Sequence, residues 1–474
     1  MKLGQTTIIS FISSLVMSVA GFIATIAITR TLGEAGYGTY AIFTALLSWI
    51  VIGGKVGFPR AVKKRISEKN SGNFVIAGSI IQLGLYIIIV FCLIFAVPYI
   101  NQLTETDFGW ILILMVGGRL FGDFIQSVLD GQHLVHVSSL LTPIEWITRM
   151  TLQVSLIVVG SGVFGLLVGY IGGTIVGITI GLYFITIKIT IPKKENFKQL
   201  YDFAQFSWLS TVRARAFHSL DTIILAFFVT NSLIGVYEIA WNLASLFTVF
   251  GSAIGRTLFP ELSMISSGDS DNEELIKLMN TGIAFAGLFM IPGLVGSALI
   301  GDVVLTIYGD GFDRGYYILL ILCFARLLAI YFGQFIGVLD ALNRPGLTFK
   351  ANVAFVGVNL ILNIILTWSM GWYGAAIATV CSAAVGLCLS YYFTTNIIDF
   401  ELPFAEISKQ IISSGIMAGV VYLFMLFSDD SLPAVALLTL VGATTYVVVL
   451  LFISEKFRNT VDDNVPYSLP ALSS

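Results

Sequence analysis

The sequence predicts an all-α integral membrane protein with about fourteen transmembrane helices, and two observations support this fold class. The first is composition, because 57% of the 474 residues are hydrophobic, only 11% are charged, and the mean hydropathy is +0.91. A soluble domain carries about 25% charged residues, so the polar side chains here are too few to cover a water-soluble body. The second is that long apolar runs, separated by short polar turns, fill almost the whole chain.

A membrane span needs roughly 20 mainly apolar residues. By that length the predicted spans are 8–29, 37–58, 74–98, 108–128, 138–159, 163–187, 203–228, 233–258, 281–304, 316–337, 348–369, 372–396, 407–427 and 433–453. The first run continues beyond Ala20, so we expect it to be a retained helix and not a cleaved signal peptide. The polar tail 456–474 is expected to be cytoplasmic and disordered.

The distribution of lysine and arginine predicts the orientation in the membrane. Segment 60–69 carries five of these cations and segment 188–198 carries four, whereas 99–107 and 428–432 have none. Loops rich in lysine and arginine remain in the cytoplasm. An even number of spans then puts both termini in the cytoplasm, and we expect a multi-pass protein of the cell membrane.

The chain also contains an internal repeat. FGDFIQSVLDG at 121–131 matches FGQFIGVLDA at 332–341, and Gly38 and Tyr40 match Gly235 and Tyr237. The copies lie about 200 residues, or six spans, apart, so both enter the membrane with the same polarity. Two such halves enclose a central cavity in several transporter folds. The predicted organisation is a six-helix bundle over 1–200, a second over 201–400, two extra helices over 401–455 and the tail 456–474.

Ionisable residues inside the predicted spans are candidates for function, since each costs roughly 2.5–3.5 kcal/mol at the bilayer centre. The span 203–228 contains Arg213, Arg215, His218 and Asp221. The last three of these are spaced by three residues and therefore form one ridge of a helix. Such a ridge should face the protein interior or water and not lipid.

Other spans carry charges in a similar way. Arg119 and Asp123 are four residues apart, as are Glu145 and Arg149, so each pair could neutralise itself along its own helix. Further charges in or near span ends are Lys55, Glu238, Arg256 and Arg326. The alternative to self-neutralised pairs is a cavity in which the cations gather. That arrangement suits an anionic substrate such as a phosphate or pyrophosphate, whose oxygens match the guanidinium fork.

Several other kinds of site are not supported by the sequence. The four cysteines lie in apolar runs, and the three histidines lack metal-ligand spacing, so we expect no disulfide framework, metal site or cofactor. No basic stripe indicates nucleic acid. The glycine-rich stretch GYIGGTIVGITIG at 169–181 lies within a span, where small residues usually allow close helix packing and do not form a phosphate loop.

The stretch RTLGEAGYGTYAIFTALL at 30–47 resembles the signature of the polysaccharide-transporter (Wzx-like) oligosaccharide flippases. These belong to the same superfamily as the multidrug and toxin extruders and the lipid II flippases. The matching positions are Arg30, Leu32, Gly33, Tyr37, Gly38 and Tyr40, followed by Gly57 and Pro59. The resemblance covers roughly residues 1–400. The two extra spans depart from the twelve-span Wzx pattern and match the fourteen spans of lipid II flippases.

The resemblance implies a MATE-like fold in which two bundles form a V-shaped cavity with alternating access. It implies a flippase, not an enzyme, that moves polyprenyl- or dolichyl-linked sugars from the cytoplasmic to the outer leaflet, for surface polysaccharide or protein glycosylation. In relatives, arginines of the first, second, seventh and eighth spans are commonly proposed to hold the anionic head group, and by position Lys55, Arg213, Arg215 and Arg256 are the candidates here. The candidates for substrate contact are Lys55, Arg119, Arg149, Arg213, Arg215, His218, Arg256 and Arg326, and those for a coupling proton or sodium ion are Asp123, Glu145, Asp221 and Glu238.

Three other functions compete with this one. A cation-coupled multidrug antiporter would share the fold, but it would need an acidic and aromatic cavity, and the arginines argue against that. A membrane-embedded glycosyltransferase or polymerase usually needs a large outer loop, whereas the longest one here, near 304–315, is short. A scaffold within an assembly of glycan-synthesising enzymes would need none of these features. The expected partners are a lipid-linked sugar, membrane lipid and glycan-assembly enzymes.

Overall fold

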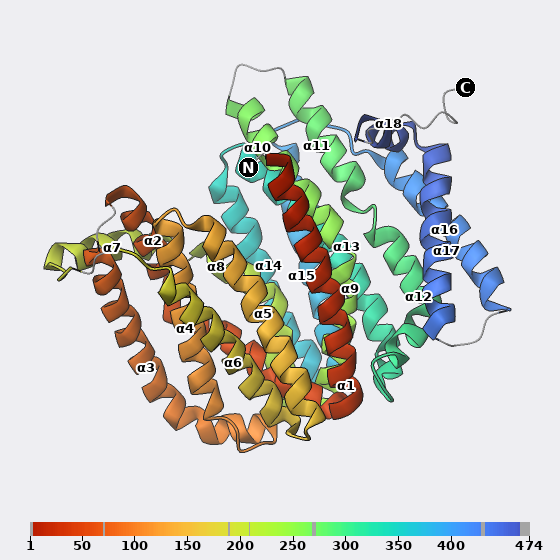
Figure 1. Ribbon diagram of the computed structural model, residues 1–474. Helices are drawn as coiled ribbons and strands as arrows, with labels where there is room; N and C mark the ends of the chain where they lie inside the picture. Colours follow the sequence, from red (N-terminus) through yellow and green to blue (C-terminus); the bar gives the residue numbers. More distant parts are fainter. Residues whose placement is uncertain are drawn as a thin grey trace. The chain divides into compact units, whose positions relative to one another are not determined.

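The computed structural model describes residues 3–69, 72–187, 190–207, 209–267, 272–427 and 432–464, and in these ranges the chain contains helices and no strands (Figure 1). The helices form two compact units. Unit 1 comprises residues 1–235 with 308–310, and unit 2 comprises 236–307 with 311–474. This division differs from the repeat-based boundary at 200/201, since helix α8 is grouped with unit 1, where it packs against α1.

Unit 1 begins with one long, broken helix, α1. The helices of unit 1 are α1 (Leu3–Lys55), α2 (Phe58–Lys69), α3 (Asn73–Thr104), α4 (Ile111–Gly131), α5 (Val135–Val158), α6 (Gly162–Tyr183), α7 (Lys194–Ser207), α8 (Leu209–Phe228) and the first turn of α9 (Asn231–Leu246). A continuous helix of the length of α1 would be roughly 80 Å long, far more than a bilayer core. Gly33, with φ 68° and ψ −178°, breaks it at a backbone conformation that essentially only glycine adopts. The predicted spans 8–29 and 37–58 are the two parts of α1.

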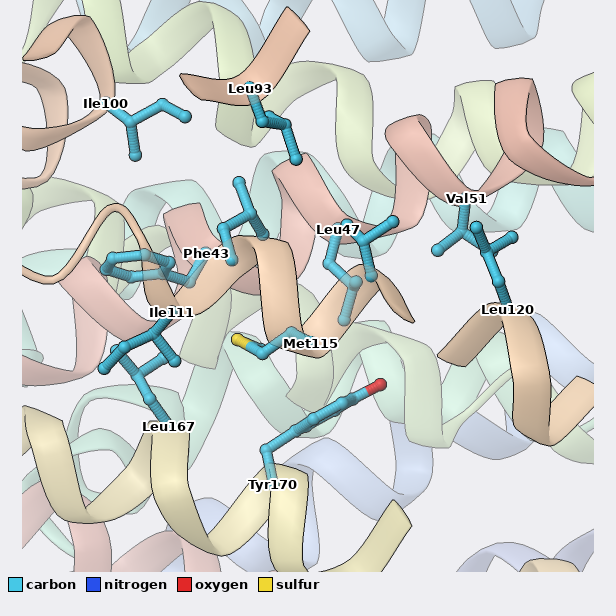
Figure 2. Close-up of a cluster of buried hydrophobic side chains, with 12 residues drawn as sticks. Phe43, Leu47, Val51, Leu93, Ile100, Ile111, Met115, Leu120, Leu167 and Tyr170 are labelled. Atoms are coloured by element: carbon cyan, nitrogen blue, oxygen red, sulfur yellow. The ribbon is translucent and has the colours of Figure 1, made fainter. Parts of the chain in front are cut away.

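Close packing at the centre of unit 1 depends on glycine. A Cβ at Gly173 of α6 would lie 2.7 Å from the Glu145 carbonyl oxygen, and one at Gly169 would lie 2.8 Å from the Gln153 backbone nitrogen. Helix α6 can therefore lie directly against the backbone of α5, and the packing interpretation of 169–181 is confirmed. Beside this contact, Phe43, Leu47 and Met115 pack together in a buried apolar cluster (Figure 2).

Among the described residues, unit 2 contains the rest of α9, nine further α-helices and one 3₁₀ turn. They are α10 (Val249–Ser267), α11 (Asn272–Ala286), α12 (Met290–Thr306), the 3₁₀ turn η1 (Phe312–Gly315), α13 (Tyr316–Ala341), α14 (Pro345–Met370), α15 (Trp372–Thr395), α16 (Phe404–Met425), α17 (Leu432–Ile453) and α18 (Glu455–Asn464). Helices α16 and α17 lie side by side and pack against α12 (Figure 1). The Tyr446 hydroxyl donates to the Leu288 carbonyl over 2.8 Å, which ties α17 to the rest of the unit.

The end of the chain differs from its prediction. Residues 456–464 of the tail expected to be disordered are part of α18, while 465–474 lie outside the described residues. The ring of Phe457 lies 6.2 Å from that of Phe285, and the Ser454 hydroxyl accepts the Phe457 backbone N–H. A local cap and one apolar anchor therefore hold this helix, although its composition is polar.

The surface of the long helices is apolar where a soluble protein would be polar. On α3, Ile87, Phe91 and Phe95 are 58%, 64% and 65% exposed. An exposed face of this kind is stable in lipid and not in water. The protein is therefore a multi-pass membrane protein.

Among the described residues, ten helices are long and apolar enough to cross a membrane, or eleven if the bent pair α9–α10 is one span. The ten coincide with ten predicted spans, and the bent pair coincides with 233–258. The predicted spans 8–29, 138–159 and 203–228 fall within α1, α5 and α7–α8. The total of fourteen stays a prediction.

The repeated motif forms the same turn in both units. After α4, the Leu134 N–H donates to the Leu129 carbonyl and His133 has φ 60°; after α13, the Arg344 N–H donates to the Leu339 carbonyl and Asn343 has φ 55°. In each turn an aspartate, Asp130 or Asp340, accepts a hydroxyl hydrogen bond from the first turns of the next helix. Similar sequences thus produce similar local structure, as the repeat predicts.

Candidate functional site

Five of the predicted site residues gather within unit 1. Lys55 ends α1, Arg119 and Asp123 lie on α4, and Glu145 and Arg149 lie on α5. Their elements are brought together by α6, whose glycines allow α5 to approach, and by the packing of α4 against α6. Residues far apart in the sequence therefore form one polar cluster among apolar helices.

Four of these residues form a chain of alternating charges, which we call the charged tetrad: Lys55, Asp123, Arg119 and Glu145. Lys55 pairs with Asp123, Arg119 lies 3.2 Å from Asp123, and Arg119 lies 3.4 Å from Glu145. The Thr174 hydroxyl of α6 donates to the same Glu145 oxygen over 3.2 Å. The tetrad is neutral in total, and each side chain is at least two-thirds buried. Pairing offsets the cost of holding these charges within the bundle.

Arg149 stands apart from the tetrad. Its guanidinium carbon lies 5.1 Å from the centre of the Tyr170 ring on α6, a cation–π contact. Its Nε is buried and has no hydrogen-bond acceptor, and within the described residues no carboxylate lies within ion-pair distance of it. The pair Arg119–Asp123 expected from the sequence is present. The pair Glu145–Arg149 is absent, because Glu145 points to Arg119 on the neighbouring helix.

A cavity of about 330 Å³ adjoins these groups. We call it the cation cavity, since its charged lining residues are Lys55, Arg119 and Arg149, with no carboxylate among them. The remaining lining residues are Tyr40, Thr44, Leu47, Ser48, Val51, Ile52 and Tyr170. The carboxylates of the tetrad therefore neutralise Lys55 and Arg119 from behind, and Arg149 contributes the excess positive charge.

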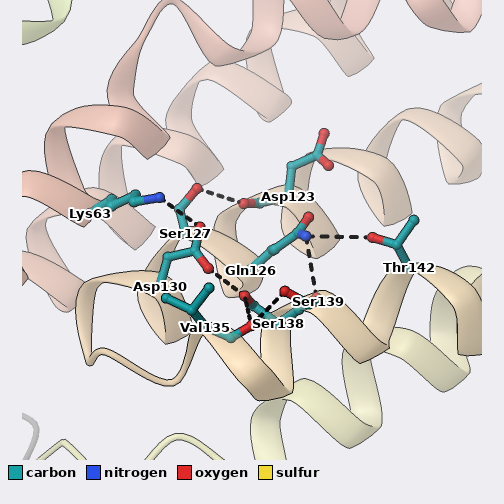
Figure 3. Close-up of polar contacts among 9 residues, drawn as sticks. All are labelled: Lys63, Asp123, Gln126, Ser127, Asp130, Val135, Ser138, Ser139 and Thr142. Atoms are coloured by element: carbon teal, nitrogen blue, oxygen red, sulfur yellow. Dashed lines mark hydrogen bonds and ion pairs between the residues drawn. The ribbon is translucent and has the colours of Figure 1, made fainter. Parts of the chain in front are cut away.

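A second cavity of about 220 Å³ shares Ile52 and Lys55 with the first and is also lined by Arg60, Asp123 and Asp130. Figure 3 shows the polar network on its wall: Lys63 donates to Asp130 over 2.8 Å, and Ser138 donates to the other oxygen of the same carboxylate. The Asp123 carboxylate points away from this network (Figure 3) and instead pairs with Lys55 and Arg119. The Lys55–Asp123 pair thus lies where the two cavities adjoin.

The other predicted site residues are not part of this cluster as far as the structure describes them. Asp221 is buried on α8 of unit 1. Arg213, Arg215 and His218 lie on α8 and Arg256 lies on α10, but these four side chains lie outside the described residues. Glu238 on α9 and Arg326 on α13 belong to unit 2.

Unit 2 does not repeat the tetrad. The repeat aligns Asp123 with Gln334, whose amide donates to the Gly251 carbonyl over 3.0 Å. Counting from the matching Ser138 and Thr348, Arg149 corresponds to Asn359, which donates to Ser382 over 3.1 Å. Arg326 lies over the Trp241 ring at 4.0 Å and donates to the Ser245 hydroxyl over 2.6 Å. Among the described side chains, a cavity with several cations is a feature of unit 1.

Sequence reasoning did not select as site residues the two tyrosines that line the cation cavity. Tyr40 lies in the signature at 30–47, and its hydroxyl accepts a hydrogen bond from the Gln153 amide over 3.0 Å. Tyr170 lies in the glycine-rich stretch, which we interpreted through its glycines alone. A tyrosine placed between packing glycines, on the face that meets the Arg149 helix, was the available signal.

Comparisons with known proteins agree with the fold and identify a matching protein family. The model of the family described as polysaccharide biosynthesis protein matches residues 3–266. The chain is 32% identical to the probable flippase AglR of Haloferax volcanii over 99% of both chains. It is 28% identical to the probable low-salt glycan biosynthesis flippase Agl15 of the same organism, over 99% of this chain and 100% of the relative.

Two solved structures resemble the fold of this chain. Lipid II flippase MurJ in its inward closed conformation matches with a TM-score of 0.78 at 18% identity, covering 96% of this chain and 100% of MurJ. An inward-facing multidrug resistance MATE family transporter of the MOP superfamily matches with a TM-score of 0.60 at 15% identity, covering 80% and 95% of the two chains. The expected MATE-like fold is confirmed.

Proposed function

The chain belongs to the polysaccharide biosynthesis protein family, and we propose that its cation cavity holds the phosphate or pyrophosphate of a lipid-linked glycan. The protein is a flippase for lipid-linked glycans and not an enzyme. Transfer would run from the cytoplasmic to the outer leaflet of the cell membrane, with both termini in the cytoplasm. The observation that carries the proposal is the half-buried Arg149, which faces the cation cavity and has no carboxylate partner among the described residues.

Anion binding follows from the charges around the cavity. A bound phosphate would meet Lys55, Arg119 and Arg149 together. Hydrogen bonds between guanidinium and phosphate are short and directional, and they strengthen where water is scarce. The phosphate would compete with Asp123 and Glu145 for the tetrad cations, whereas no carboxylate of the described residues pairs with Arg149. Arg149 should therefore contribute most to the affinity.

The same competition offers a route to coupling. When an anion draws Lys55 and Arg119 toward the cavity, Asp123 and Glu145 lose part of their neutralisation, and a carboxylate in that state binds a proton or a sodium ion more readily. We propose these two as the coupling groups in unit 1. Asp221 and Glu238, together with the substrate candidates Arg213, Arg215, His218, Arg256 and Arg326, stay candidates from sequence.

A drug antiporter remains the rival with the same fold. A cavity lined by three cations repels an organic cation, so the described part of unit 1 favours the anionic substrate. The two functions predict substrates of opposite charge, so transport by the purified protein distinguishes them.

The test is transport by the purified protein in liposomes, using lipid-linked sugars extracted from the source cells and a membrane-impermeant reagent that modifies outward-facing sugars. Loss of a charge-assisted hydrogen bond costs about 1.5–3 kcal/mol, so Arg149→Gln should lower transport by about tenfold or more. Arg344→Gln changes an exposed loop arginine and serves as the matched control. Undiminished transport by Arg149→Gln would sink the assignment of the cavity. Wild-type protein that moves a cationic dye and no lipid-linked sugar would support the antiporter.

A further inference from the structure

A separate hollow of about 540 Å³ lies in unit 2. We call it the tyrosine hollow. Its lining residues are Asp302, Val303 and Thr306 of α12, Asp313 and Arg314 of η1, Tyr316 and Tyr317 of α13, and Tyr373 of α15. Its size falls in the range of about 300–1,000 Å³ typical of small-molecule pockets. None of its residues takes part in the cation cavity.

The walls of the tyrosine hollow are held in place by contacts within unit 2. The Tyr316 hydroxyl donates to the Ala298 carbonyl of α12 over 2.7 Å, and its ring meets that of Tyr317 edge-on at 5.1 Å. The Arg314 Nε donates to the Gly311 carbonyl over 3.1 Å, which orients the guanidinium. The Tyr373 ring packs edge-on against buried Trp372 at 5.5 Å. The rings are therefore positioned in advance, which lowers the entropy cost of binding a ligand.

The chemistry of the lining selects among ligands. Two carboxylates outnumber one guanidinium, so a phosphate, whether from a lipid head group or from solution, would be repelled. Tyrosines are common at membrane surfaces as lipid anchors, but such anchors direct their hydroxyls toward head groups. The Tyr316 hydroxyl instead bonds within the protein, while the Tyr317 side chain is 62% exposed. The hollow combines exposed ring surface, hydrogen-bond acceptors and a charged donor.

A neutral sugar matches this combination. Its hydroxyls both donate to carboxylates and accept from a guanidinium, and its C–H faces pack on aromatic rings. We propose that the tyrosine hollow is a binding site for uncharged hexose or N-acetylhexosamine units of the glycan. The choice of glycan as ligand rests on the proposed function. The loop 304–315 lies on the outer side in the proposed orientation, so the site would hold sugar units that have crossed the membrane.

Saturation-transfer NMR on the full chain in lipid nanodiscs tests the site, with glucose, mannose and N-acetylglucosamine as probes. We expect saturation of the ring protons of at least one probe. Tyr317→Ala and Asp313→Asn should each lower that signal by about fivefold, in keeping with the loss of one ring or one acceptor. Tyr99→Ala removes a tyrosine that is 75% exposed on α3 and should leave the signal unchanged.

Three results would overturn the inference: no saturation of any probe by the wild-type protein, an undiminished signal from Tyr317→Ala, or displacement of the sugar signal by tetraphenylphosphonium, which would indicate a cation site. The outcome is separable from that of the proposed function. Arg149→Gln should keep sugar binding while its transport falls by about tenfold or more. A wild-type protein that binds sugars at the hollow but transports no lipid-linked glycan would refute the flippase assignment and leave this site standing.

Discussion

At the scale of single residues, the same residue type has two different roles in one cluster. Arg119 lies between two carboxylates and is neutralised by them, whereas Arg149, on the next helix, rests on a tyrosine ring and faces a cavity. The difference arises from which neighbour Glu145 meets across the helix interface. A sequence spacing of four residues makes an ion pair available, and the packing of α4 and α5 decides whether it forms.

The Lys55–Asp123 pair should couple energetically. Removing one partner leaves the other charge largely buried without it, so Lys55→Met and Asp123→Asn together should cost less than the sum of the two single changes. We expect a coupling free energy of about 1 kcal/mol, within the range for contacting residues. A double-mutant cycle of thermal unfolding in detergent measures it.

The exposed pair Lys64–Glu68, separated by 3.9 Å on α2, is the control and should show coupling near zero. Additive effects for Lys55→Met and Asp123→Asn would mean that the tetrad does not depend on this contact.

At the scale of elements, two glycines, Gly38 on α1 and Gly235 on α9, allow their helices to approach closely. A Cβ at Gly38 would lie 1.7 Å from the Asn231 carbonyl oxygen, and one at Gly235 would lie 2.0 Å from the Glu34 carbonyl oxygen. Gly38 and Gly235 are matching positions of the repeat, and so are Glu34 and Asn231. The two copies of the signature therefore cross at their backbones, in one symmetric contact that leaves no room for side chains.

Gly38→Ala should force these helices apart and lower stability by about 1–3 kcal/mol. Gly53→Ala, also on α1, is the matched control, because no atom of the described residues lies within 4 Å of the added Cβ. That change should be neutral or stabilising by up to about 1 kcal/mol, since alanine favours helix more than glycine does. Thermal unfolding of both variants in one detergent checks the pair, and equal stability of the two would show that the crossing is loose.

At the scale of the whole molecule, the two copies of the repeat share their turns but differ in charge. Unit 1 has the tetrad and Arg149, while Gln334 and Asn359 occupy two of the matching positions in unit 2. These neutral amides hydrogen-bond to neighbouring helices and need no opposite charge beside them. The anionic part of the substrate should therefore interact mainly with unit 1 among the described residues.

The proposed orientation can be tested by labelling. In a variant with Cys92, Cys323, Cys381 and Cys388 replaced by serine or alanine, a cysteine in place of Asp107 should react with a membrane-impermeant maleimide on intact cells. A cysteine in place of Lys64 should react only after the membrane is permeabilised, because its loop carries five cations. The reverse pattern would invert the orientation and place the tyrosine hollow on the cytoplasmic side.

Much of the architecture follows from the sequence, because it depends on the length of the apolar runs and on the internal repeat. Long apolar runs specify helices of a length that suits the bilayer, the repeat predicts a turn that forms twice, and Gly33 in the signature lies at a break that needs a positive φ. The charged residues of α4 and α5 could likewise be identified as candidates, since an unpaired charge in a span is costly.

The tertiary structure decided which of those charges meet. The absent Glu145–Arg149 pair, the bridge from α4 to α5 through Arg119, and the placement of Tyr40 and Tyr170 beside the cation cavity all depend on contacts between helices distant in sequence. The ordering of α18 by Phe457 is of the same kind. Local propensity and hydropathy act within a segment, whereas the neighbours of a charge are set by how closely two backbones can approach, which here depends on the glycines of α6.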